Sequence, residues 1–361
     1  MTTNSLLFSA SPPAANLLSS PLLEEEKRVL RVMENRIDFA SNDYLGFASS
    51  LELRDAIAKK VSQLEKVGST GSRLLTGNSV VYEDLEREIA AFHGAEAGLL
   101  FSSGYAANLG LLSAVAHRDD TIFYDQRVHA SIRDGITLSR ARNYPFHHNC
   151  CSDLERLLQK GGRGKRFVVV ESVYSTTGAL APLQEIAALG EAYGVILLVD
   201  EAHATGVFGA GRVTQEEIEP FARVHTFGKA LGVSGGIILG SSSLRDYLIS
   251  HCRPFIYTTA LSSLQLIAIE AAYDLLERTS HTLLEACRDF GLESPIDFIS
   301  FGNPERAKKV AASIQQEGFD VRPLLYPTVL RGEEGLRICF HTYNTKEEGE
   351  RLYASLDRYR D

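Results

Sequence analysis

The sequence lacks the features that mark secreted, zinc-binding and membrane-spanning proteins. Its five cysteines are odd in number and show no C-x-x-C spacing, so neither a disulfide framework nor a structural zinc site is expected. No apolar run approaches ~18 residues, which predicts no transmembrane helix. Residues 1–23 contain no Lys or Arg, although a signal peptide begins with a basic region. We therefore expect a cytoplasmic protein without a metal site.

A block of basic residues is also missing. The chain has 37 Lys and Arg against 46 Asp and Glu, a formal net charge of −9. This balance argues against nucleic acid or an anionic membrane as the main partner. The 361 residues, 44% of them hydrophobic, are typical of a globular protein. At ~100–200 residues per domain, they predict two domains or one large α/β unit.

Short apolar runs alternate with helical segments through the middle of the chain. The runs cover residues 98–101, 121–124, 167–170, 195–199 and 236–239. Helical stretches such as 153–158 and 183–193 lie between them. Continuous apolar strands alternating with helices indicate an α/β fold with a mostly parallel sheet that is covered on both faces. Such sheets bind ligands at the carboxyl ends of their strands, so the residues after each run are the first candidates.

Both ends of the chain differ from this pattern. The remaining signals are helices at 22–32, 51–67, 80–92, 264–277 and 305–317, and strands at 296–300, 321–326 and 335–341. The C-terminal set predicts a smaller α+β domain. We expect an N-terminal segment at 1–47, a large domain at 48–263 and a small C-terminal domain at 264–361.

Two segments contain candidate catalytic residues. Asp200 and His203 come directly after the run at 195–199; taken alone, a helix cap and a surface histidine explain them equally well. Lys229 lies in Thr-Phe-Gly-Lys-Ala-Leu-Gly at 226–232. A desolvated Lys has a lowered pKa and is nucleophilic, although a lone Gly-Lys in a loop is usually structural.

Two further turns complete a pattern. Residues 102–108 follow a predicted strand, and small residues before a helix start can bind an anion with free amides. His129 also follows a strand. The order Gly104, His129, Asp200, Lys229 is that of fold-type I pyridoxal-phosphate (PLP) enzymes. There, Lys forms a Schiff base, Asp keeps the ring nitrogen protonated, a turn holds the phosphate and an imidazole stacks on the ring.

Four longer strings resemble the α-oxoamine synthases, a family of fold-type I PLP-dependent transferases. They lie at residues 41–46, 68–77, 200–206 and 226–236, and the resemblance runs from about Asn42 to the C-terminus. It implies a large PLP-binding domain with a mostly parallel sheet between helices, a smaller C-terminal domain and a homodimer. The implied reaction is the decarboxylative condensation of an amino acid with an acyl thioester.

Residues 233–236 and 255–261 are most similar to the branch that makes a biotin precursor from L-alanine and a pimeloyl thioester, carried by CoA or a carrier protein. An enzyme that acetylates glycine, or one with another acyl donor, is the alternative within the family. Outside it, an aminotransferase shares the skeleton but not the four strings. A catalytically silent subunit would usually lack the Schiff-base lysine.

The resemblance implies a role for each matching residue. Lys229 would hold PLP and move the Cα proton, Asp200 would pair with the pyridine nitrogen and His203 with the phenolic oxygen. His129 would stack on the ring and is the fourth implied catalytic residue. The phosphate side would be lined by Gly104, Tyr105, Ser175 and Thr226, and completed across a homodimer by Thr258 and Thr259. The implied substrate contacts are Asn42, Thr328 and Arg337.

The sequence departs from the family at three places. The family carries an Arg upstream that contacts the acyl substrate, whereas no Arg precedes Glu24 here. Thr177 and Cys150 stand where acidic residues are common. These differences leave the acyl donor open, and they predict weaker dependence on CoA than is usual in the family.

Overall fold

The computed structural model describes residues 30, 32 and 34–359. The chain divides into two compact units, residues 1–36 and 37–361, and the second carries the fold described below. The predicted leader and nearly all of the predicted helix at 22–32 lie outside the described residues. The predicted domain boundaries at residues 47 and 263 remain predictions.

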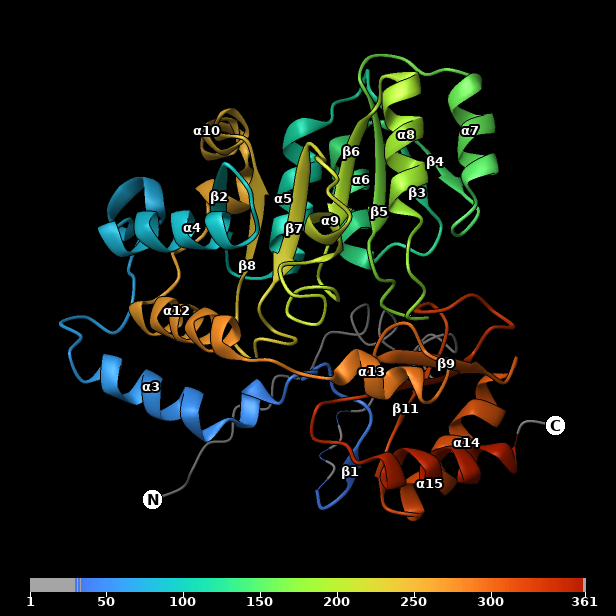
Figure 1. Ribbon diagram of the computed structural model, residues 1–361. Helices are drawn as coiled ribbons and strands as arrows, with labels where there is room; N and C mark the ends of the chain where they lie inside the picture. Colours follow the sequence, from blue (N-terminus) through green and yellow to red (C-terminus); the bar gives the residue numbers. More distant parts are fainter. Residues whose placement is uncertain (1–29, 31, 33, 360–361) are drawn as a thin grey trace, which may run out of the picture. The chain divides into compact units, whose positions relative to one another are not determined.

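A seven-stranded sheet is the centre of the second unit, with the strand order β2-β8-β7-β6-β5-β3-β4 (Figure 1). In chain order the strands are β2 (Ala97–Phe101), β3 (Thr121–Asp125), β4 (Arg142–Phe146), β5 (Arg166–Glu171), β6 (Ile196–Asp200), β7 (Ala222–Thr226) and β8 (Gly236–Gly240). Strand β8 runs antiparallel to β2 and β7, while the remaining neighbours pair in parallel. The expected α/β fold with a mostly parallel sheet is confirmed.

Strands β4 and β7 were not predicted, for two different reasons. Four of the five residues of β4 are exposed, because this strand forms one edge of the sheet, so no apolar run marks it. Strand β7 is buried but contains Arg223 and His225. Arg223 Nη1 donates to Thr214 Oγ1 and His225 Nδ1 bonds to Thr205 Oγ1, so part of the polar surface of this buried strand is satisfied by neighbouring side chains.

Helices cover the sheet on both faces, since four successive residues of β5, Phe167 to Val170, are at most 3% exposed. The helices of this region are α4 (Val80–Phe92), α5 (Gly104–Val115), α6 (Ala130–Ser139), α7 (Cys151–Gln159), α8 (Leu183–Tyr193), α9 (Arg212–Gln215), α10 (Ser242–His251) and α11 (Arg253–Ile256). Helices α4 and α8 have the predicted bounds. Gly194, at φ 60°, ends α8 in the left-handed conformation that glycine adopts without strain.

The C-terminal part has its own sheet, in which β9 (Ile296–Ser300), β12 (Gly335–Cys339) and β11 (Arg322–Leu324) pair antiparallel. The helices that follow the main sheet are α12 (Ser263–Arg278), α13 (Leu283–Arg288), α14 (Pro304–Gln316) and α15 (Lys346–Asp357). These elements match the predicted α+β pattern, although β11 is shorter than the expected strand at 321–326.

An early segment joins this C-terminal part. Strand β1 (Ile37–Asp38) pairs in parallel with β10 (Phe319–Asp320). The next residue, Phe39, packs against Phe319 and Phe340. The segment then reaches a short 3-10 helix (Phe47–Ser49) and α3 (Leu51–Val61), which ends six residues before the predicted helix end. The Phe39 carbonyl accepts from the Cys339 amide at 2.8 Å, which joins this segment to β12.

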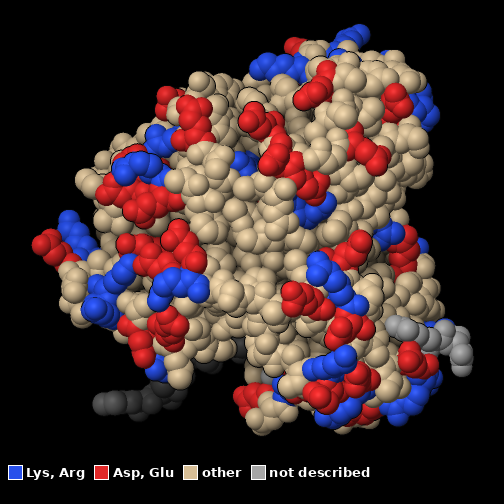
Figure 2. All heavy atoms as spheres, viewed as in Figure 1, with Lys and Arg blue, Asp and Glu red and all other residues tan. Residues whose placement is uncertain are grey.

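The visible surface mixes charges of both signs, with Lys and Arg beside Asp and Glu rather than gathered in one patch (Figure 2). Within the described residues, no helix combines the length and apolar character needed to cross a membrane.

Candidate active site

The carboxyl ends of the main strands meet at one edge of the sheet, and most of the predicted residues lie there. Asp200 is the last residue of β6 and Thr226 the last of β7. Gly104 begins α5 directly after β2, and a Cβ at Gly104 would lie 3.0 Å from the Cβ of Thr226. Two of the predicted phosphate-side residues are therefore neighbours, and a side chain at position 104 would be in tight contact with Thr226.

Asp200 and His129 are joined by a chain of hydrogen bonds. The Asn108 side-chain amide donates to Asp200 Oδ2 at 2.7 Å and to Ser131 Oγ at 3.0 Å. Ser131 Oγ lies 2.8 Å from His129 Nδ1, and the Ser131 backbone amide donates to the same nitrogen at 3.2 Å. Since Nδ1 accepts, a neutral His129 carries its proton on Nε2. The His129 ring is exposed at this edge and free to stack on a ligand.

A second chain of hydrogen bonds joins His203 to the predicted substrate residues. His203 Nδ1 lies 2.7 Å from the Tyr44 hydroxyl, which donates to Asn42 Oδ1 at 3.2 Å. Asn42 Oδ1 also accepts from Arg337 Nη2 at 3.1 Å. Arg337 Nη1 donates to the Ser175 carbonyl at 3.0 Å. The apolar neighbours of Arg337 on β12, Leu336 and Ile338, are fully buried, so Arg337 faces the opposite side of the strand, towards the site.

Electrostatics at this edge favour neutral nitrogen bases. Burial lowers the pKa of Lys229 to about 8, although Asp200 and Glu171 oppose the shift. Partial desolvation also lowers the pKa of His129, part of whose surface remains exposed, and full burial places the pKa of His203 well below its usual range. At about pH 7 roughly a tenth of Lys229 is therefore free amine, far more than for an ordinary lysine, and this is the form that attacks a carbonyl.

This arrangement fits PLP. Helix α5 has twelve residues, and its first amides, at Gly104 and Tyr105, have no acceptor within the helix. These two amides would suit a phosphate, whereas the amide of Ala106 already donates to Ser103 Oγ. Asp200 offers a buried carboxyl group to a ring nitrogen, and Lys229 offers an amine to an aldehyde. The donor set therefore matches each functional group of the cofactor.

Three predicted residues are not part of this cluster within the chain. Thr258 and Thr259 lie in an exposed segment after α11, and no hydrogen bond of the described residues connects them to Asp200 or Lys229. Thr328 is exposed in the loop before β12, where its backbone amide donates to Leu325. Their predicted roles require a second subunit or a bound substrate, and remain predictions.

Four polar residues of the cluster had no role in the sequence-based prediction: Tyr44, Asn108, Ser131 and Glu171. Tyr44 and Asn108 lie inside motifs that were recognised. Asn108 is one helical turn after Gly104, a spacing that places both on one side of α5. Glu171 directly follows the predicted strand at 167–170, as Asp200 follows the one at 195–199, and this position was its available signal.

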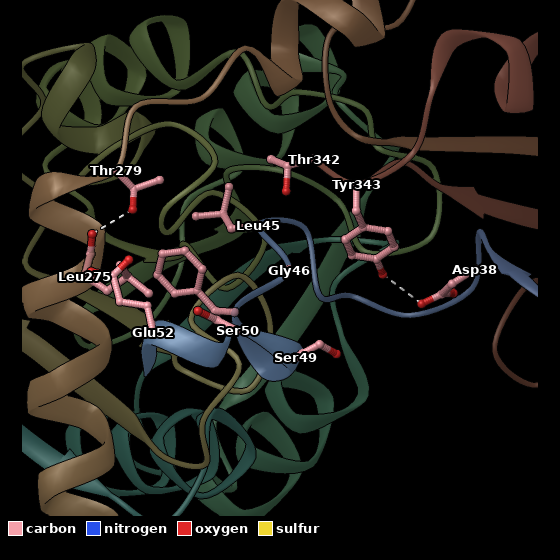
Figure 3. Close-up of a pocket in the computed structure, with 11 residues that line it drawn as sticks. Asp38, Leu45, Gly46, Ser49, Ser50, Glu52, Leu275, Thr279, Thr342 and Tyr343 are labelled. Atoms are coloured by element: carbon pink, nitrogen blue, oxygen red, sulfur yellow. Dashed lines mark hydrogen bonds between the residues drawn. The ribbon is translucent and has the colours of Figure 1, made fainter. Parts of the chain in front are cut away.

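A cavity of about 660 Å³ borders the segment after Tyr44 and is lined by Leu45, Gly46, Phe47 and Tyr343 among others (Figure 3). The Tyr343 hydroxyl there donates to Asp38 Oδ2 at 2.9 Å. None of the predicted site residues lines this cavity, so it is separate from the Lys229 edge.

Comparisons with known proteins identify the family of this chain. A family model described as aminotransferase class I and II matches residues 34–356. The chain is 40% identical to an 8-amino-7-oxononanoate synthase of Emericella nidulans, covering 91% of each chain. A solved 8-amino-7-oxononanoate synthase of Francisella tularensis is 28% identical with a TM-score of 0.77, covering 90% of this chain and 98% of its own. A serine palmitoyltransferase of Sphingomonas wittichii is 26% identical with a TM-score of 0.81, covering 99% and 98%.

Together with these similarities, the fold and the residues around Lys229 define a fold-type I transferase that depends on PLP. The chain belongs to the aminotransferase class I and II family, and within it to the α-oxoamine synthases. It is accordingly an enzyme of the PLP-dependent acyltransferase type, and the predicted cofactor is confirmed. The roles of the individual residues remain predictions.

The Tyr44 hydroxyl provides a first test of these roles. Tyr44→Phe removes the partner of His203 Nδ1 and one donor to Asn42. We expect about tenfold weaker PLP binding, the effect of one buried hydrogen bond, measured by titrating the apoprotein with PLP. Tyr343→Phe is the matched control, because this hydroxyl is bonded to Asp38 outside the site. Equal PLP affinity for the two variants would show that Tyr44 does not position His203.

Proposed function

We propose that the chain condenses L-alanine with a pimeloyl thioester, giving 8-amino-7-oxononanoate, CO₂ and the free thiol, as a step of biotin biosynthesis. The observation that carries this proposal is the 40% identity, over 91% of both chains, to a relative named for that product. The adjacent Arg337 and Asn42 side chains support it, because they suit the carboxylate of an amino acid.

The reaction changes two carbon–carbon bonds of the alanine Cα, since one is formed and another is broken. A bond forms between the alanine Cα and the thioester carbonyl carbon, and the carbon–sulfur bond breaks to release the thiol. The bond from Cα to the carboxylate then breaks, CO₂ leaves and a proton takes its place. When bound, PLP supplies the electron sink that stabilises negative charge on Cα.

The residues of the chain would prepare the substrate for these changes. Arg337 would hold the carboxylate of the amino acid, with Asn42 beside it. Lys229 Nζ would take the proton from Cα, for which its lowered pKa leaves a free amine. Asp200 would keep the cofactor's ring nitrogen protonated, and its bonds from Asn108 and Ala202 hold the carboxylate in place for this.

Thiol release from a panel of substrates tests the proposal. Purified protein would be assayed with L-alanine, glycine and L-serine, each with pimeloyl-CoA and a pimeloyl carrier-protein ester. Alanine should be preferred, by about 10–200-fold in kcat/KM, because one methyl group in an apolar pocket contributes this much discrimination. Preference for serine would instead support the activity named for the Sphingomonas wittichii relative. Preference for glycine with acetyl-CoA would support glycine acetylation.

A homodimer would bring Thr258 and Thr259 into a second phosphate site. Both lie beside an apolar patch, which we define as Leu74, Leu75 and Tyr257. These three side chains are 51%, 81% and 72% exposed, more than isolated apolar side chains favour in water. The short π-helix (Arg73–Gly77), which carries Leu74 and Leu75, lies close to α11, because Arg73 lies over the ring of Phe255 in α11. A second copy of the chain would cover the patch.

Leu75→Asp tests this dimer. A charge within a buried apolar interface should convert the protein to monomers and weaken PLP binding by at least about tenfold, as measured by analytical ultracentrifugation and PLP titration. Leu138→Asp is the control, since Leu138 is an exposed leucine of α6 outside the patch. A wild-type monomer with full activity at micromolar concentration would contradict the dimer.

A further inference from the structure

Glu171 and Asp200 are neighbours at the active-site edge. Glu171 is the last residue of β5, Asp200 is the last residue of β6, and the two pair in register in the parallel sheet. Paired residues of parallel strands lie about 4.8 Å apart and point to the same face. The two residues are 2% and 5% exposed. Two carboxyl groups are thus buried side by side.

Their hydrogen bonds differ. Asp200 accepts from the Asn108 side chain at 2.7 Å and from the Ala202 amide at 2.9 Å, with one bond to each oxygen. Glu171 accepts at Oε2 from the Ser175 amide at 3.0 Å. Its other oxygen, Oε1, is buried and has no hydrogen-bond partner among the described residues. Donors stabilise a charged carboxylate, so Asp200 is the better place for a negative charge.

A proton on one of the two acids removes the repulsion between two buried negative charges. Two adjacent buried carboxylates cannot both be ionised without a large cost, so one of them keeps a proton. Glu171 can carry this proton on Oε1, because Oε2 accepts from Ser175. Burial, reinforced by the charge of Asp200, raises the pKa of Glu171 to about 8, in agreement with this geometry. The titratable and charged groups around Glu171 are Asp200, Lys229, Tyr174 and, through Ser175, Arg337, and the backbone amide of His129 also lies near its carboxyl group.

We propose that Glu171 is a positioning residue that acts as a neutral acid, so that Glu171 and Asp200 together present one negative charge to the cofactor. This inference rests on the proposed pairing of Asp200 with the ring nitrogen of PLP. An ionised Glu171 would add a second negative charge beside an anionic cofactor and beside Lys229. A neutral Glu171 still fixes the Ser175 amide, and with it the loop that Arg337 contacts.

PLP titration of apoprotein across pH tests the proposal. Glutamine is a neutral analogue that keeps an acceptor for Ser175, so Glu171→Gln should match the wild type at about pH 7. Above the pKa of Glu171, the wild type gains a charge that the variant lacks. The wild-type Kd should therefore rise relative to that of the variant, to about tenfold at about pH 9. Parallel Kd curves, or a Glu171→Gln variant already altered at about pH 7, would overturn the proposal.

Glu201→Gln is the matched control. Glu201 is a second buried acid, with its pKa raised to about 7 by burial, but it accepts from the Arg212 and Val213 amides away from the site. The PLP Kd of Glu201→Gln should vary with pH as the wild-type Kd does. If Glu201→Gln instead diverged from the wild type in the way expected for Glu171→Gln, the effect would not be specific to Glu171 and the proposal would be overturned. Infrared spectra of the Glu201→Gln apoprotein provide a second measurement, because this variant keeps Glu171 and lacks the other buried acid with a raised pKa. This measurement does not require the Glu171→Gln variant to fold. A protonated carboxyl band at about pH 7 that disappears by about pH 9 is expected, and its absence would count against the proposal.

These outcomes are separate from failure of the proposed function. If the wild type bound PLP without a covalent bond to Lys229, the assigned cofactor site would be wrong. The proposal for Glu171 would then be wrong as well. If PLP bound at Lys229 but alanine were not condensed, the substrate assignment would fail and the Kd comparison would still decide the role of Glu171.

Discussion

Lys229→Ala should abolish turnover, with a fall in rate of at least about a thousandfold, and should remove the visible absorbance that arises from a lysine–PLP adduct. The reason is that the proposed reaction uses this amine twice, to hold the cofactor and to take the Cα proton. No hydrogen bond or ion pair among the described residues involves the Lys229 amine, so the apoprotein should keep its thermal stability. Rates would be measured as thiol release and the adduct by absorbance.

Lys59→Ala is the control for this substitution, because Lys59 is an exposed lysine of α3 remote from the sheet edge. It should leave both the visible band and the rate unchanged. A Lys229→Ala protein that turns over at a rate comparable to the Lys59→Ala protein would remove Lys229 from the reaction.

Asp200→Asn should retain PLP but react about 10²–10³-fold more slowly, the usual loss when one preorganised charge is removed from a catalytic site. The amide can still accept from Asn108 or Ala202, so the hydrogen-bond chain to His129 is kept in part. It cannot keep the ring nitrogen of the cofactor protonated, and negative charge on Cα is then poorly stabilised. Exchange of the alanine Cα proton with D₂O, followed by NMR, isolates this step from acyl transfer.

Asp274→Asn serves as the control for the charge change. Asp274 is a half-exposed acid of α12 that pairs with Lys60 on the surface, and its loss should leave the exchange rate unaltered. Near-normal Cα exchange in Asp200→Asn would refute the pairing of Asp200 with the ring nitrogen.

Much of the fold follows from local sequence patterns. Strands such as β5 and β6 are buried on both faces and read as continuous apolar runs, so they were predicted within one or two residues. Strand β4 lies at the sheet edge with a polar sequence, and in β7 the buried Arg223 donates to the carbonyl of Gly94, 129 positions away. Burial of such polar residues depends on tertiary contacts that no local pattern contains.

The candidate site, like the fold, could be predicted from the sequence only in part. Lys229, Asp200 and His203 lie in sequence motifs that indicate their chemical roles. The fold brings these motifs together at one edge of the main sheet. Tyr44 contacts His203 across 159 positions of the chain, and Asn108 contacts Asp200 across 92. Such contacts become visible only in three dimensions. The register of β5 with β6, which sets Glu171 beside Asp200, is of the same kind.

The most direct test of the central claim follows the carboxyl carbon of alanine. The protein would be incubated with L-alanine labelled with ¹³C in the carboxyl group and a pimeloyl thioester. The account predicts one labelled CO₂ and one free thiol for each molecule of unlabelled 8-amino-7-oxononanoate, measured by mass spectrometry. Formation of labelled pyruvate without thiol release, or a condensation product that retains the label, would contradict it.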